Sequence, residues 1–224
     1  MARMTDPPPV TARTAPGSEA EPRSQRKRRA ILEAATTRFL RNGYRGTSMD
    51  EIAALAGVSK QTVYKAFSDK ESLFSEIVIS AVKEAADPVY AEVLELEDTG
   101  DIEADLRGFA RRLLKRVMQP QILQLRRLVI GEAERFPELG RTFYEQGPGR
   151  TIAALAPVFE RLAATGALQV DDPLLAAAHF NWLVMSMPLN RAMFLGEHEP
   201  PASAELNRFA DAGVRAFLAA YAQR

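Results

Sequence analysis

The sequence predicts an all-α protein with an N-terminal unit of short helices and a C-terminal part of longer antiparallel helices. From about residue 24 onward, apolar residues recur at helical spacing, and Gly, Pro and Asp separate the periodic stretches. No stretch alternates apolar and polar residues between hairpin turns, which leaves little room for a sheet. Hydrophobic residues make up 46% of the 224 positions, enough for an apolar core.

Composition divides the chain into three regions. Residues 1–22 are rich in Pro, Ala, Thr and Arg without periodicity, so we expect a disordered arm. Residues 23–75 hold short helices with strong start and stop signals, and residues 76–224 hold the longer ones. The arm lacks the apolar core of a secretory signal, and the chain has no Cys, so we expect a cytoplasmic location.

The first two predicted helices are delimited by local signals. A helix over about 24–42 carries a regular apolar face and stops at Gly43. Ser48 and Glu51 have the spacing of a capping box, in which side chain and backbone groups satisfy each other at a helix start. This spacing predicts a second helix over residues 48–55.

A tight turn follows. Gly57 suits the left-handed backbone conformation that such a turn needs, because it has no Cβ. Ser59 can then cap a third helix through about Phe67. Ser68 and Glu71 repeat the capping-box spacing, which predicts that a fourth helix starts there.

Five longer helices are expected in the C-terminal part, over residues 101–118, 121–135, 148–165, 173–195 and 203–223. Phe136 and Pro137 are interpreted as the end of the second of them. Pro157 marks a potential kink in the third of them. The helix over 173–195 is apolar nearly all round, so it must be covered on more than one side. Small residues at Ala210 and Gly213 would let another helix approach the last one closely.

Charge is distributed unevenly along the chain. Residues 22–70 contain eleven basic and four acidic side chains, a net charge of +7, and the rest of the chain balances it because the total is zero. A basic front joined to an acidic body suggests that one end meets a polyanion. Two differently solvated surfaces would also explain it.

The second and third predicted helices have the layout of a helix-turn-helix. In this motif the first helix braces across the DNA backbone and the second lies in the major groove. Val63 and Phe67, four residues apart, can anchor one side of the third helix in the core. The polar side chains clustered within two turns of its start form the candidate reading face: Lys60, Gln61, Thr62, Tyr64 and Lys65.

The segments GYRGTSMDEIA (43–53), AGVSKQTVYKAF (56–67) and DKESLF (69–74) resemble the DNA-binding domain of the tetracycline-repressor (TetR) family. The resemblance covers about residues 24–75 and implies a homodimeric regulator, usually a repressor released by a small molecule. It implies DNA contacts for the five reading-face residues just named. It also implies phosphate contacts for Thr47, Ser48 and Lys70, but none for Ala66, where many relatives have His.

The stretch RLVIGEAERFPEL (127–139), with residues 166–168 and 171–173, is similar to the AefR-type C-terminal domain. This similarity implies a ligand-binding and dimerisation domain whose last two helices pair in a four-helix interface. Two candidate sets follow. The candidate pocket residues are Phe109, Leu113, Arg127, Trp182 and Met185, for which plain core packing is the alternative. The candidate interface residues are Phe180, Met187, Phe209, Gly213 and Phe217.

Basic residues at the start of the first helix form another candidate contact. Residues 26–29 place four cations near the positive end of a helix, which is unfavourable unless an anion is close. We expect Lys27 to contact a DNA phosphate, with a merely charged helix start as the alternative.

Other chemistry finds little support in the sequence. With His179 and His198 as the only histidines and no Cys, we expect no metal site, and no cofactor motif is present. Glycine-rich phosphate loops, G-x-S-x-G and H-E-x-x-H are missing, so an enzyme is not expected. Residues 173–190 carry no charge, but polar residues interrupt them, so we expect no membrane span.

The function predicted from these patterns is a homodimeric repressor that reads a pseudo-palindromic operator and responds to an unknown small-molecule effector. An activator or a ligand-independent regulator would use the same DNA chemistry. The alternative from another class is a helical small-molecule-binding or interaction protein without specific DNA binding.

Overall fold

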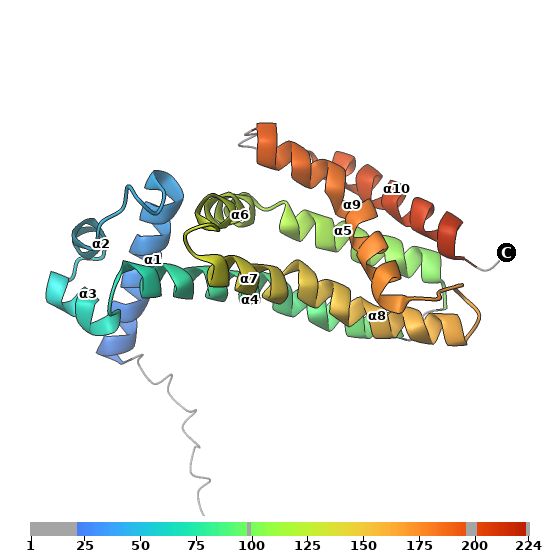
Figure 1. The fold of residues 1–224 in the computed structure, drawn as a ribbon, viewed down its shortest axis with the longest axis horizontal. Helices are drawn as coiled ribbons and strands as arrows, with labels where there is room; N and C mark the ends of the chain where they lie inside the picture. The colour runs from blue at the N-terminus through green and yellow to red at the C-terminus, as the bar shows by residue number, and fades with distance from the viewer. Residues whose placement is uncertain (1–21, 98–99, 196–200, 223–224) are drawn as a thin grey trace, which may run out of the picture.

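The computed structural model describes residues 22–97, 100–195 and 201–222. The predicted arm, except for its last residue, lies outside these ranges, as do His198 and the end of the last predicted helix. Apart from an isolated bridge between Leu168 and Ala222, all regular structure in the described residues is helical. This confirms the predicted all-α class (Figure 1).

Three helices form the N-terminal unit: α1 (Arg23–Asn42), α2 (Met49–Leu55) and α3 (Lys60–Ala66). Gly43 and Gly57 take positive φ values of 73° and 65°, so both turns use the conformational freedom of glycine. Ser48 and Glu51 form the predicted capping box at α2. The predicted helix starts and the turn between α2 and α3 are therefore confirmed.

Helix α4 (Lys70–Leu94) is capped by Asp69, one residue after the predicted cap Ser68. Asp69 is the cap: its carboxylate accepts a hydrogen bond from the Ser72 backbone N–H at 2.7 Å, and the Ser72 hydroxyl accepts one from the Asp69 N–H at 3.3 Å. The predicted pairing of Ser68 with Glu71 is wrong, because Asp69 offers an equally favourable cap one residue on. The helix then continues unbroken past residue 75.

The C-terminal part begins with a short 3-10 turn, η1 (Glu95–Glu97). Its helices are α5 (Ile102–Val117), α6 (Pro120–Glu132), α7 (Pro137–Gln146), α8 (Pro148–Ala164), α9 (Pro173–Leu195) and α10 (Ser203–Tyr221). All but α7 were predicted, and the described helix ends fall within about three residues of the expected ones. Pro137 was interpreted only as a stop for the preceding helix, but it occupies the first turn of α7, where its missing N–H costs nothing.

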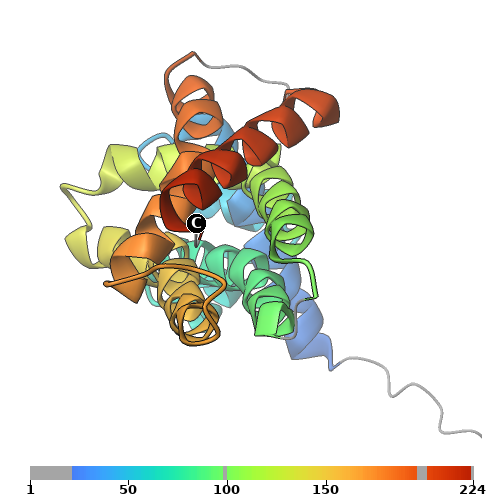
Figure 2. The same cartoon turned by 90° about the vertical axis from the view of Figure 1, so that its right-hand side faces the viewer.

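Two apolar cores lie along the molecule, and α4 contributes to both. Figure 1 shows α4 running from the N-terminal unit along the C-terminal part, and Figure 2 shows the same helices from the end of the C-terminal part. The larger core lies among α4, α5, α8, α9 and α10. The smaller core lies under the N-terminal unit but also includes Leu125 and Val129 of α6 and Leu139 and Phe143 of α7. The N-terminal unit is thus packed against the C-terminal part through α4, α6 and α7.

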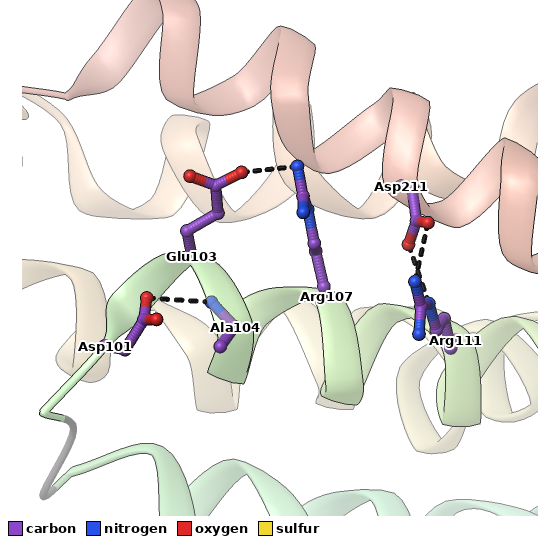
Figure 3. A network of polar contacts seen from close by, with 6 residues as sticks. All are labelled: Asp101, Glu103, Ala104, Arg107, Arg111 and Asp211. Carbon is purple, nitrogen blue, oxygen red and sulfur yellow. Dashed lines mark hydrogen bonds and ion pairs between the residues drawn. The ribbon is translucent and has the colours of Figure 1, made fainter.

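Helices α5 and α10 are joined by a two-pronged ion pair (Figure 3). The Arg111 guanidinium donates from Nε and Nη2 to the two carboxylate oxygens of Asp211, each at 2.7 Å. These hydrogen bonds lower the pKa of Asp211. On the other side of α10, a Cβ on Gly213 would lie 2.8 Å from the Leu183 carbonyl oxygen, so glycine permits the close approach of α9.

No helix in the described ranges combines the length and the apolar character that crossing a membrane requires. The uncharged stretch that begins at Pro173 lies in α9, which packs against α8 and α10.

Candidate nucleic-acid interface and neighbouring cavity

Helix α3 presents one polar face to the surroundings and one apolar face to the core. Val63 and Phe67 are buried, with 0% and 4% of their surface exposed. Lys60, Gln61, Tyr64 and Lys65 are exposed, and Thr62 is half-buried beside the Ser59 cap. Four of the five predicted reading-face residues therefore face outward, and Thr62 lies at the edge toward α1.

Lys60 is not free on this face. Its Nζ lies 2.8 and 3.0 Å from the carboxylate oxygens of Asp50 in α2. The hydrogen bond that Lys60 donates to the Asp50 carboxylate raises the pKa of Lys60. An approaching base or phosphate must compete with this carboxylate.

A groove between α1 and α3 collects further cations. Its lining residues are Arg23, Ser24, Lys27, Arg28, Ile31, Thr62, Lys65 and Ala66. Arg28 is held in place by an ion pair with Glu76 and lies 4.7 Å from the centre of the Phe67 ring. Among the described residues no carboxylate pairs with Lys27 or Lys65, so these two cations face the groove uncompensated.

The structure places Thr47 and Ser48 differently from the phosphate contacts that the resemblance implied. Thr47 is 2% exposed, and its hydroxyl donates to the Gly43 carbonyl at 2.8 Å. A hydroxyl has one proton, so Thr47 has none left for a phosphate. The Ser48 hydroxyl likewise donates to Glu51 Oε2 at 3.0 Å while it accepts from the Glu51 N–H. Both residues instead stabilise the start of α2.

Lys70 also has internal partners. Its Nζ donates to the carbonyl oxygens of Tyr44 at 2.9 Å and Thr47 at 2.8 Å, and lies 4.4 Å from the centre of the Tyr44 ring. Burial lowers the pKa of Lys70. Because an ammonium has three protons, only one remains for a phosphate. Lys70 therefore fastens the loop between α1 and α2 to the first turn of α4.

An aromatic cluster connects the N-terminal unit to the loop between α6 and α7. The ring of Phe136 lies 4.8 Å from that of Tyr44 and 6.2 Å from that of Phe74, between ring centres. The Arg135 guanidinium lies 5.1 Å from the centre of the Tyr44 ring. Sequence reasoning missed this contact, since residues 135 and 136 were interpreted only as the end of a helix.

A small apolar cavity lies between the middle of α9 and the middle of α4. Its volume is about 60 Å³. The residues that line it are Val82, Ala85, Ala86, Val89, Leu113, Val117, Ile122, Leu125, Arg126, Phe143, Gly147, Pro148, Thr151, Asn181, Trp182, Met185 and Leu189.

Three of the five candidate pocket residues, Leu113, Trp182 and Met185, line this cavity. Phe109 does not: it is fully buried, and its ring stacks on that of Phe180 with centres 6.1 Å apart. Arg127 is also elsewhere, since it donates to the Ala192 carbonyl at 2.8 Å. The polar residues of the cavity, Arg126 and Asn181, were not in the predicted set.

The candidate interface residues are mostly inside the single chain. Phe180 and Phe217 are fully buried, and Gly213 packs against α9, so none of the three is available to a second subunit. Phe209 is partly buried, whereas Met187 is 59% exposed. Met187 belongs to an exposed apolar stripe on α9, which we call the α9 stripe: Leu175, Trp182, Leu183, Met187 and Phe194.

Comparison with known proteins matches both halves of the chain. Residues 31–77 match the model of the tetR family of bacterial regulatory proteins, and residues 104–223 match the C-terminal domain of AefR-like transcriptional repressors. The HTH-type transcriptional repressor SCO4008 of Streptomyces coelicolor is 31% identical over 171 residues, 74% of this chain and 82% of that protein. Other curated relatives match over less of their own length, 30% of one regulator and 48% of another.

Two solved structures are similar over nearly the whole chain. A TetR-family transcriptional regulator from Mesorhizobium loti has a TM-score of 0.82 and 46% identity, covering 90% of this chain and all of that one. The flavonoid-responsive regulator FrrA has a TM-score of 0.66 and 33% identity, covering 89% and 99%. From the outward face of α3 and these matches together, we conclude that the chain belongs to the TetR family of DNA-binding transcriptional regulators, with an AefR-like C-terminal domain.

Proposed function

We propose that the protein is a homodimeric repressor that binds a pseudo-palindromic operator and leaves it when a small molecule enters the cavity. The observation that carries this proposal is the continuity of α4. Its first turn holds Lys70 beside the N-terminal unit, and its middle forms a wall of the cavity. A displacement of α4 at one end therefore reaches the other.

On DNA, α3 would lie in the major groove. Gln61 and Lys60 are placed to contact base edges, and Tyr64 stands beside them on the same face. Lys27 and Lys65, on opposite sides of the groove between α1 and α3, are suited to backbone phosphates. Two such helices in one dimer would enter successive major grooves roughly 34 Å apart.

The α9 stripe is the surface we assign to the dimer. Several large apolar side chains exposed along one helix are typical of a protein–protein contact. On the neighbouring helix α10, the exposed residues Ala212 and Ala216 are small, so a second helix pair could pack closely. Trp182 belongs to the stripe and also lines the cavity, so the partner subunit would lie beside the effector site.

Release would follow from the size of the cavity. At about 60 Å³ it is far smaller than the ~300–1,000 Å³ of typical small-molecule sites, so an effector must push its walls apart. Val82, Ala86 and Val89 of α4 form one wall. An effector would then favour the population in which the two α3 helices no longer match the operator. The similar protein FrrA is a flavonoid-responsive regulator.

This function requires binding but no catalysis, and we therefore propose that the protein is not an enzyme. Because its operator would be chromosomal DNA, we place it in the bacterial cytoplasm.

Fluorescence anisotropy with DNA from upstream of its own gene tests the proposal. We expect binding at least about a thousandfold tighter than to length-matched random DNA. Tyr64→Ala should weaken it, while Tyr144→Ala, a tyrosine of similar exposure on α7, should not. Equal affinity of the native protein for both DNAs would support a helical interaction protein instead. A reporter assay with and without the protein would separate a repressor from an activator.

A further inference from the structure

We propose that the cavity binds an apolar molecule that carries an anionic oxygen group such as a carboxylate, held by Arg126 and Asn181. The inference rests on the proposed function, because it names the chemical class of the effector. Both residues line the cavity, and Arg126 Nε and both polar atoms of the Asn181 side chain are buried without a hydrogen-bond partner.

Arg126 projects from α6 into an apolar environment. Its Nε is buried and has no hydrogen-bond partner, and its guanidinium lies 5.4 Å from the centre of the Phe143 ring. No carboxylate of the described residues pairs with it, and burial lowers its pKa. Because a guanidinium only donates hydrogen bonds and stays charged, it needs an acceptor that carries negative charge.

Other arginines of the helical body differ from Arg126 in having a carboxylate partner. Arg111 pairs with Asp211, Arg116 with Glu92, and Arg150 with Asp87. Arg111 is exposed and Arg116 and Arg150 are half-buried like Arg126, but each of these three has its own carboxylate. Arg126 is half-buried, its Nε is shielded from solvent, and it has no carboxylate partner among the described residues, so a bound anion would offset the desolvation of its guanidinium.

Asn181 is the second polar group in the cavity. It is 1% exposed, and neither its Oδ1 nor its Nδ2 has a hydrogen-bond partner. Buried amides are almost always hydrogen-bonded, so an unpartnered one in a cavity wall indicates a ligand. Its Nδ2 can donate to an anionic oxygen alongside Arg126, and its Oδ1 can accept from a hydroxyl of the same molecule.

The remaining side chains that line the cavity indicate the chemical character of the rest of the ligand. Aliphatic and aromatic side chains from α4, α5 and α9 dominate it, among them Val89, Leu113 and Met185. These walls favour hydrocarbon. A cationic ligand would be repelled by Arg126, and a neutral one would leave the charge uncompensated.

Two matched pairs of probes test the inference by isothermal titration calorimetry: decanoate against 1-decanol, and 2-naphthoate against 2-naphthalenemethanol. We expect the acid of at least one pair to bind at least about tenfold more tightly than its alcohol. In Arg126→Met this preference should vanish, and Asn181→Leu should reduce it. Arg127→Met is the matched control, because the neighbouring arginine bonds to the Ala192 carbonyl and not into the cavity.

Equal binding of acid and alcohol to the native protein, no binding of either acid, or an unchanged preference in Arg126→Met would each overturn the inference. Folding of Arg126→Met is checked by its thermal transition without ligand, which should be at least as high as that of the native protein. Operator binding, measured separately, tests the proposed function. If the alcohols release the protein from DNA as well as the acids do, the proposed effector cavity is supported and the proposed preference for an anion is wrong.

Discussion

The groove between α1 and α3 and the C-terminal body differ in how their cations are paired. In the unit, Lys27 and Lys65 face a groove without carboxylate partners, and short capped helices hold them there. In the body, arginines such as Arg111 and Arg116 are paired across helices. Unpaired cations therefore mark where an external anion is expected: DNA phosphate at the groove and, by the same reasoning, an effector at Arg126.

The two regions also differ in what stabilises them. Helices α2 and α3 have seven residues each and depend on caps and on a few buried side chains. The body has long helices around a core of stacked rings, in which Phe180 contacts Phe109, Phe159 and Phe217. We infer that the body provides most of the stability and the unit most of the recognition.

The largest expected effect comes from the core of the body. Phe180→Ala removes a fully buried ring and should lower the free energy of unfolding by about 3–5 kcal/mol, measured by urea denaturation. The exposed Tyr144→Ala should change it by less than about 0.5 kcal/mol. A loss below about 1 kcal/mol for Phe180→Ala would contradict the assignment of stability to the body.

A charge in the α9 stripe should separate the subunits. Met187→Asp places a carboxylate on the proposed interface, so we expect monomers at micromolar concentration in analytical ultracentrifugation. Because this variant loses the dimer, its affinity for the operator should also fall, although α3 is unchanged. Gln124→Asp, on the exposed side of α6, is the control and should remain a dimer. A dimeric Met187→Asp would show that the subunits meet elsewhere.

Within the N-terminal unit, phosphate and base contacts should be separable. Lys65→Ala should weaken binding to operator and random DNA alike and reduce the salt dependence by about one counterion. Gln61→Ala should instead cost about 1–3 kcal/mol at one base pair and relax its sequence preference. Anisotropy titrations at several salt concentrations measure both. Identical salt slopes for Lys65→Ala and the native protein would rule out a phosphate contact at Lys65.

The smallest expected effect is on the pH dependence of stability, through the Arg111–Asp211 ion pair between α5 and α10. Hydrogen bonds from Arg111 lower the pKa of Asp211, so the ion pair stabilises the fold above the ordinary carboxyl value of about 3.9. The contribution is lost as pH falls through the lower native pKa. Asp211→Asn should therefore be slightly less stable at neutral pH and lose less stability on acidification. Thermal melts between neutral and acidic pH measure this, with the exposed Glu145→Gln as control.

Sequence patterns predicted helices and caps well where the signal was local. The box at Ser48 and the turn at Gly57 involve groups within four residues of each other, and both are present. The errors arose where two local solutions competed. Asp69 caps α4 in place of Ser68, and Pro137 opens a helix that was interpreted as a break.

The sequence by itself determined the all-α class, the outward face of α3 and the family. Those features depend on periodicity, capping and a dense motif, all of which are properties of neighbouring residues. The tertiary structure alone decided the partners of Lys70 and the availability of Thr47, because their contacts depend on how the loop before α2 folds back on α4. It also decided that Arg126 and not Arg127 faces the cavity. Adjacent residues in a helix point about 100° apart, so only the packing of α6 against its neighbours selects between them.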